Sequence, residues 1–228
     1  MSGLRDLLEA AIGEGVFPGA CYAVHRDGRT ARGAVGRHTY CPDDPATRLD
    51  TVWDLASVSK VVGTTTGAMI LFEEGRLELD RPVADLLPEF GQNGKEKITP
   101  RNLLVHNSGL VAFRPYHRTR SDSDQVLDAI YGEELVYETG SKSVYSDLSM
   151  IVLQKLMERI SGQPLDAFLA ERVFKPLGMK ETGYRPDPAR CAPTETVEPW
   201  RAELRRKRGV RLDEIWIRGE VHDPTATV

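Results

Sequence analysis

The sequence lacks long hydrophobic runs, has few cysteines and carries no strong excess of either charge. No window approaches the roughly 18 uninterrupted apolar residues that a membrane-spanning helix needs. Three cysteines in 228 residues exclude a disulfide-stapled scaffold, and the odd count favours reduced thiols. The formal net charge of −4 is too small to indicate a nucleic-acid or membrane-surface partner, and we expect neither.

The N-terminal segment does not have the pattern of a secretory signal. It carries Arg5, Asp6, Glu9 and Glu14 where a signal peptide would be apolar. Its leucines recur at helical spacing, so we expect an amphipathic helix here. The absence of an export signal predicts a cytoplasmic location.

Strand-like segments come next in the chain. Asp27-Gly28 lies between two short apolar runs, and this dipeptide tolerates the positive φ angles of a tight turn. The pattern therefore predicts a β-hairpin. A third short strand is expected at Thr51–Leu55.

Helical patterns begin at Ser57 and continue to Tyr184. Thr99-Pro100 places a capping oxygen before a proline suited to a first helical turn. Ser143–Ile160 is apolar over much of its helical circumference, which predicts a buried helix. Another helix is expected to start at Pro164.

Strands followed by helices predict an α+β fold rather than alternating βαβ units. We expect the N-terminal part of a sheet domain at residues 1–56 and a mainly helical domain at residues 57–184. Residues 185–228 are expected to form an irregular connecting segment. Six basic residues lie between 201 and 211 against one Glu203, and we expect them to form a solvated surface.

The clearest chemical pattern is Ser57-Val-Ser-Lys60, an S-x-x-K motif. On a helix, a spacing of three places both side chains on one face, where an amine could take the serine proton. The four residues alone also occur by chance in many soluble helices. Moreover, the β-branched residues and glycines at 61–67 disfavour a helix and would by themselves suggest a strand.

A resemblance decides between these alternatives. The run LASVSKVVGTTTGAMILFEEGRLELDRPVADLLPEF resembles the active-site region of the penicillin-recognising serine hydrolases. The closest branch is the class C β-lactamase-like group, which includes esterases, D-aminopeptidases and D-Ala-D-Ala carboxypeptidases. Three further segments match in the same order, at Ile98–Leu110, Val144–Tyr184 and Gly219–Ala226.

The resemblance implies a β-lactamase/DD-peptidase-like fold, in which a helical domain is inserted into an antiparallel sheet. It also implies that Ser57 is the acylated nucleophile, Lys60 its general base and Tyr145 a proton shuttle. The Ser57 backbone N–H would supply half of the oxyanion hole. The alternative for Tyr145 is a core tyrosine that opens a buried helix.

Asp147 stands where the family has an asparagine, and it is the expected substrate-binding residue. A carboxylate only accepts hydrogen bonds, whereas an amide also donates them. A substrate carbonyl would therefore lose a donor, which disfavours β-lactam turnover more than ester cleavage. Asp147 could still hold Lys60 by its charge.

The family's third motif, a K-T-G or H-T-G strand, is not found in the sequence. Lys180–Gly183 and Glu138–Gly140 have related letters, but they are expected to be turns. On the family pattern, the N-terminal strands are present and the C-terminal strands are missing, so we expect the first two-thirds of an enzyme.

These observations favour a serine hydrolase that cleaves an ester or amide, with a D-amino-acid peptide or β-lactam also possible as substrate. No cofactor and no metal are expected, because the histidines show no metal-ligand spacing. His106 is expected to hydrogen-bond the backbone rather than to act in catalysis. The alternative function is an incomplete or non-catalytic member of the fold that acts in ligand binding or assembly.

Overall fold

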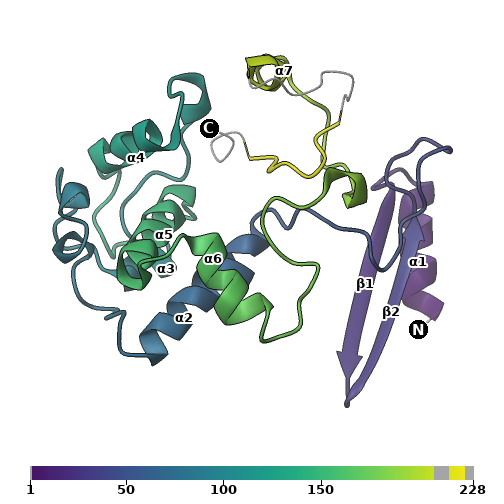
Figure 1. The fold of residues 1–228 in the computed structure, drawn as a ribbon, viewed down its shortest axis with the longest axis horizontal. Helices are drawn as coiled ribbons and strands as arrows, with labels where there is room; N and C mark the ends of the chain where they lie inside the picture. Colours follow the sequence, from purple (N-terminus) through teal and green to yellow (C-terminus); the bar gives the residue numbers. More distant parts are fainter. Residues whose placement is uncertain (1, 208–215, 224–228) are drawn as a thin grey trace. The chain divides into compact units, whose positions relative to one another are not determined.

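The computed structural model describes residues 2–207 and 216–223, and the chain divides into two compact units (Figure 1). The first contains the described residues of Met1–Asp54 and Arg185–His222, and the second contains Leu55–Tyr184 and Asp223. The first carries a two-stranded antiparallel sheet, and the second is helical. The α+β class is therefore confirmed.

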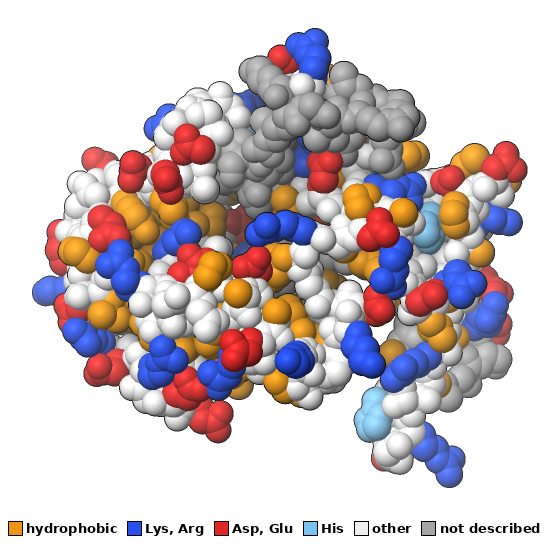
Figure 2. All heavy atoms as spheres, viewed as in Figure 1, with side chains coloured by type: hydrophobic (Ala, Val, Ile, Leu, Met, Phe, Trp, Pro, Cys, Tyr) orange, Lys and Arg blue, Asp and Glu red, His pale blue; other side chains and the backbone are white. Residues whose placement is uncertain are grey.

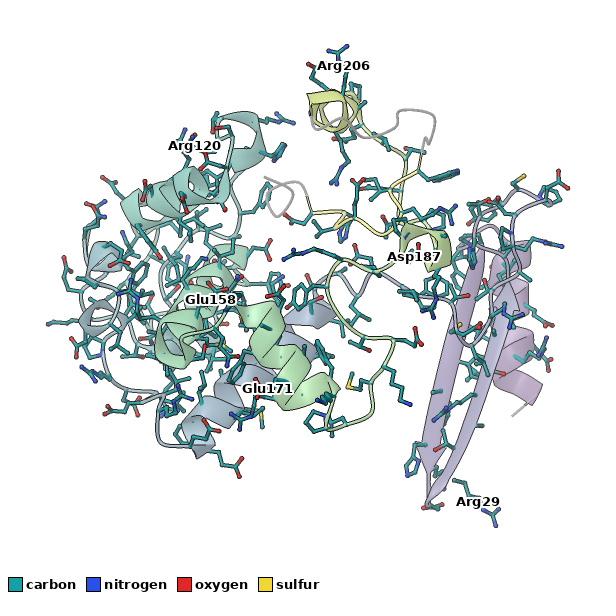
Figure 3. All side chains as sticks on the ribbon, viewed as in Figure 1. Arg29, Arg120, Glu158, Glu171, Asp187 and Arg206 are labelled. Atoms are coloured by element: carbon teal, nitrogen blue, oxygen red, sulfur yellow. The ribbon has the colours of Figure 1, made fainter. Side chains whose placement is uncertain are left out.

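The N-terminal helix and hairpin form as the sequence predicts. Helix α1 (Ser2–Gly13) contacts strand β2 (Arg29–Gly36), which pairs with β1 (Gly19–Arg26). The connecting Asp27 and Gly28 have φ angles of 50° and 73°, as a two-residue turn of this hand requires. Figure 3 shows Arg29 at the tip of the hairpin.

The third strand expected at Thr51–Leu55 does not form. Only Val52 makes a bridge, which is parallel and pairs it with Cys191. The Val52 N–H donates to the Arg190 carbonyl at 3.2 Å, and the Ala192 N–H donates to the Val52 carbonyl at 2.9 Å. These two bonds join the later segment to the hairpin unit, but they are too few for a strand.

The later segment also contains a 3₁₀ turn at Pro188–Arg190 and helix α7 (Pro199–Lys207). Arg201 in α7 is only 1% exposed. Its guanidinium donates to the carbonyls of Val221 and His222 at 2.8 and 2.6 Å. The expectation of a solvated surface is wrong for Arg201, because a buried guanidinium is retained where its donors are satisfied. Residues 208–211 of that stretch lie outside the described residues.

The helical unit is assembled from short helices and turns. Its α-helices are α2 (Thr66–Glu73), α3 (Pro100–Leu104), α4 (Ser123–Gly132), α5 (Asp147–Ser161) and α6 (Leu165–Leu169). π-Helices lie at Lys60–Thr65 and Ala170–Phe174, and 3₁₀ turns at Val83–Asp85, Pro88–Phe90 and Tyr116–Arg118. The core of this unit is continuous and contains the buried face of α5.

Residues 61–67 are helical despite their poor helix propensity. Gly67 explains why, since a Cβ there would lie 2.5 Å from Met157 Cε and 3.2 Å from Leu169 Cδ2. The glycine thus allows α2 to approach α5 and α6 closely, and the burial gained outweighs the local preference for a strand. The preceding turns are π-helical, and the Thr66 hydroxyl donates to the Val61 carbonyl at 2.9 Å.

Helix α5 begins four residues later than the sequence predicts. The backbone just before it is engaged elsewhere, because the Val144 N–H donates to the His106 carbonyl at 2.8 Å. The Asp147 N–H likewise donates to the Ala112 carbonyl at 2.9 Å. Ser146 caps the helix by accepting the Ser149 N–H. The segment that precedes α5 is therefore tied to the turn around His106.

Glu158 connects α5 to α6 and is labelled in Figure 3. Its carboxylate accepts the Leu165 N–H at 3.1 Å and the Lys155 ammonium at 2.8 Å. Burial pushes the pKa of Glu158 upward most strongly, but these hydrogen bonds outweigh it and hold the pKa below its usual value. The helix predicted to start at Pro164 forms here, with its first turn anchored to α5.

Acidic and basic side chains are interspersed over the visible face of the helical unit (Figure 2). This agrees with the near balance of 30 basic and 34 acidic residues in the chain. In the part of the chain that the structure describes, no helix is long and apolar enough to cross a membrane. Cys21, Cys41 and Cys191 are all free thiols.

Candidate active site

Ser57 lies in an exposed turn immediately before the helical residues that lead into Lys60–Thr65. The preceding Ala56 has a φ of 46°, in the left-handed region, which turns the chain sharply into the helix. The Ser57 carbonyl accepts the Lys60 N–H at 3.1 Å. Among the described residues, the Ser57 N–H has no acceptor, so it is available to a ligand.

Lys60 is the centre of the site. Its Nζ donates to Ser57 Oγ at 3.1 Å and lies 2.8 Å from Asp147 Oδ1. It also lies 5.1 Å from the centroid of the Tyr145 ring, within the range of a cation–π contact. The structure therefore brings together all four site residues that the sequence predicts.

Lys60 is held in its protonated form. Burial pushes its pKa downward and is the largest single influence. Hydrogen bonds and charge interactions with Asp147 and Tyr145 act in the opposite direction, and together they raise the pKa above the usual value. The amine is consequently an ammonium at neutral pH.

Tyr145 is 51% exposed and precedes α5 by two residues. This does not fit the alternative of a core tyrosine. Its ring contacts that of His106, with centroids 4.8 Å apart and planes inclined at 43°. Asp147, the first residue of α5, forms an ion pair with Lys60. Tyr145 and Asp147, two residues apart in the chain, thus both contact this lysine.

His106 is a member of this cluster that the sequence did not place there. Its Nδ1 accepts the backbone N–H of Ser146 at 3.2 Å, so the expected backbone hydrogen bond is present. The ring contact with Tyr145 was not foreseen. The one signal was the position of His106 in the VHNSG turn, within a segment that carried the resemblance.

No group of histidine, cysteine, aspartate and glutamate suited to a metal ion occurs within residues 2–207 and 216–223. The chemistry of the cluster is instead that of a hydroxyl, an amine, a phenol and a carboxylate. A serine beside an amine and a second proton-transfer group is an arrangement for nucleophilic catalysis. Lys180–Gly183 and Glu138–Gly140 lie in turns and bends, as expected.

Comparison with known proteins fits this arrangement. A family model described as Beta-lactamase matches residues 4–218. The chain belongs to the beta-lactamase family. The resemblance to the penicillin-recognising serine hydrolases and the β-lactamase/DD-peptidase-like fold are thereby confirmed. Of the family's antiparallel sheet, the described residues form the hairpin β1–β2.

The family relatives include enzymes of several kinds. The chain is 30% identical over 246 aligned positions to the N-acetylmuramyl-L-alanine amidase of Bacillus subtilis (strain 168), covering 97% of this chain and 55% of the relative. The solved structure of EstCE1, a hydrolase with promiscuous acyltransferase activity, is 29% identical with a TM-score of 0.74, covering 85% of this chain and 56% of that one. A class C beta lactamase from Rhodobacter sphaeroides is 24% identical with a TM-score of 0.67, and the match covers 85% and 57% of the two chains. The chain thus spans about half the length of these relatives.

Proposed function

We propose that the protein is a serine hydrolase that cleaves an ester or amide through an acyl-enzyme on Ser57. The distance of 3.1 Å between Lys60 Nζ and Ser57 Oγ carries the proposal. An unassisted serine hydroxyl is a weak nucleophile, and it needs a base within hydrogen-bond reach. Membership of a family of hydrolases supports the same conclusion.

In the proposed reaction, Ser57 Oγ attacks the carbonyl carbon of the substrate and its proton passes to Lys60. Collapse of the tetrahedral intermediate breaks the bond to the leaving group, which takes a proton through Tyr145 or Lys60. Water then attacks the acyl-enzyme, releases the acid and returns a proton to Ser57. Since Lys60 accepts a proton only as a neutral amine, its raised pKa makes acylation faster in alkaline solution.

The Ser57 N–H supports stabilisation of the developing oxyanion. It lies at the start of a helical segment, where free N–H groups and the helix dipole favour negative charge. One donor supplies part of an oxyanion hole, and removal of a single donor in a serine protease costs roughly 100-fold to 1,000-fold in rate. The acyl-enzyme proposal therefore assigns one oxyanion donor to the Ser57 N–H.

The carboxylate of Asp147 favours esters over β-lactams as substrates. Its carboxylate is paired with Lys60, and a carboxylate has no donor for a substrate carbonyl. An amide substrate needs more help at the leaving group and the carbonyl than an activated ester does. We therefore propose an activated or small ester as the preferred substrate class.

A fluorescent fluorophosphonate probe, which reacts with activated serines, tests the nucleophile. We expect labelling of the chain that is lost in Ser57→Ala. Ser59→Ala is the matched control, because Ser59 is an exposed serine two residues away whose side chain makes no capping bond. A folded chain that takes up no probe would contradict the proposal and favour the non-catalytic ligand-binding alternative.

The substrate class is tested by turnover. A panel of p-nitrophenyl esters of increasing acyl length is set beside a chromogenic cephalosporin. We expect ester hydrolysis that depends on Ser57 and is greater than cephalosporin hydrolysis. Faster turnover of the cephalosporin would contradict the preference that we assign to Asp147.

A further inference from the structure

The arrangement around Tyr145 points to a positioning residue beyond the four predicted site residues. We propose that His106 holds Tyr145 and Asp147 against Lys60, and that protonation of its imidazole releases them. This inference rests on the proposed function for its catalytic consequence. Its structural part stands on the contacts of His106 alone.

His106 accepts hydrogen bonds from the backbone on both sides of Tyr145. Its carbonyl accepts the N–H of Val144 at 2.8 Å, and its Nδ1 accepts the N–H of Ser146 at 3.2 Å. Its ring contacts the ring of the residue between them, with centroids 4.8 Å apart. Three contacts from one residue thus fix the backbone and the side chain of Tyr145.

Ser146 connects the contacts of His106 to the position of Asp147. It is fully buried, and its hydroxyl donates to the Val111 carbonyl at 2.8 Å and accepts the Ser149 N–H at 3.2 Å. A buried N–H that loses its acceptor is costly, so the position of Ser146 depends on Nδ1. Because Ser146 lies between Tyr145 and Asp147, a shift of its backbone moves both partners of Lys60.

The hydrogen bond is possible only for the neutral imidazole. Nδ1 must carry a lone pair to accept the Ser146 N–H, which leaves the proton on Nε2. Protonation at Nδ1 would set one N–H against another and abolish the bond. The release therefore has a direct chemical cause, which is the loss of an acceptor.

The surroundings of His106 favour the neutral form at neutral pH. Burial lowers its pKa most strongly, and the ammonium of Lys60 on the neighbouring π-helix lowers it further. The carboxylate of Asp147 on α5 and then the backbone contact with Ser146 push the pKa upward, but the net shift is downward. In the part of the chain that the structure describes, the titratable groups around His106 include Lys60, Asp147 and Tyr145, and the Tyr137 hydroxyl donates to the His106 carbonyl at 3.3 Å.

The backbone conformation of His106 determines which substitutions can be made without strain. Its φ of 57° lies in the left-handed region, where asparagine and glycine are the easiest residues to accommodate. His106→Asn keeps a side-chain acceptor in place of Nδ1 but does not titrate. His106→Gly removes the acceptor and the ring without backbone strain. His25→Asn makes the same chemical change in strand β1, which belongs to the other unit.

The experiment follows the Ser146 amide by ¹H–¹⁵N NMR and the Tyr145 ring by ¹³C NMR between roughly pH 5 and 8. In the unmodified chain and in His25→Asn, we expect both signals to change with one shared midpoint. In His106→Asn, neither should change over this range. In His106→Gly, the Tyr145 signals at neutral pH should already differ from those of the unmodified chain.

The rate of probe labelling at Ser57 gives the catalytic readout. Because Lys60 must lose its proton, the rate rises with pH in every variant. We expect an additional fall below the NMR midpoint that is absent in His106→Asn, and a fall of roughly tenfold to 100-fold in His106→Gly. A Ser146 amide that does not respond to His106 protonation would overturn the inference. So would an unchanged Tyr145 signal in His106→Gly. The NMR result does not require labelling, so failure of the proposed function is recognised separately.

Discussion

The ammonium of Lys60 and the carboxylate of Asp147 lie 2.8 Å apart, with side chains that are 20% and 31% exposed. This ion pair sits on the same nitrogen that donates to Ser57. It has two opposite effects on a base, because it orients the amine and also holds it protonated. In the proposed reaction, the residue at position 147 therefore influences the pH at which Lys60 accepts the serine proton.

Asp147→Asn should move the pH dependence of acylation. Removal of the carboxylate takes away a principal cause of the raised Lys60 pKa, so a larger fraction of the amine is neutral at each pH. We expect probe labelling to rise at a lower pH, and each unit of displacement corresponds to about a tenfold gain in neutral amine. Labelling rates measured across neutral and alkaline pH test this.

Asp80→Asn is the control for this change, since Asp80 pairs with Arg101 in an exposed position. Its labelling profile should be unchanged. A lower labelling rate at every pH in Asp147→Asn, without displacement of the profile, would show that Asp147 orients Lys60 without controlling its protonation.

Ser146→Ala should destabilise the helical unit. It removes the cap of α5, and it leaves the Val111 carbonyl without the hydroxyl that donates to it. We expect the free energy of unfolding to fall by roughly 2 kcal/mol, as measured by chemical denaturation. Asp122→Ala removes the exposed cap of α4, for which about 1 kcal/mol is expected. An equal loss in both variants would contradict the importance of burial at Ser146.

Tyr116 should make the protein sensitive to alkaline solution. Its hydroxyl donates to Glu133 at 2.7 Å, and burial followed by the Glu133 contact raises its pKa. A raised pKa stabilises the folded chain below the usual tyrosine value of about 10, and this contribution is lost as the pH rises above that value. Tyr116→Phe should reduce the alkaline loss of unfolding free energy. If the unfolding free energy of Tyr116→Phe falls with alkaline pH as steeply as that of the unmodified chain, other groups cause the alkaline loss.

Gly109→Ala should disturb the turn that follows His106. Gly109 has a φ of 94°, and a Cβ would lie 2.6 Å from the Tyr137 carbonyl oxygen. We expect the free energy of unfolding to fall by about 2 kcal/mol or more, because of backbone strain and displacement of the backbone. Gly140→Ala is the matched control, because its φ is 84° with nothing within 4 Å of a Cβ. Equal thermal stabilities of the two variants would exclude a role for the contact.

Local sequence was sufficient for several elements. Asp27-Gly28 specified the hairpin because both residues accept positive φ. Thr99 caps α3, as the Thr-Pro pair predicted, and Asn102 completes a reciprocal cap that the pair did not indicate. The spacing of Ser57 and Lys60 likewise determined their contact, since three residues make about one helical turn.

Tertiary structure decided the rest. Residues 61–67 prefer a strand locally, but the close packing of Gly67 on Met157 and Leu169 makes them helical. Tyr145 and Asp147 reach Lys60 because the chain before α5 is bound to the turn at His106. The resemblance of the sequence to a known family indicated that these residues belong to one site. The distances between them depend on backbone hydrogen bonds and burial, which form only when segments far apart in the chain pack together.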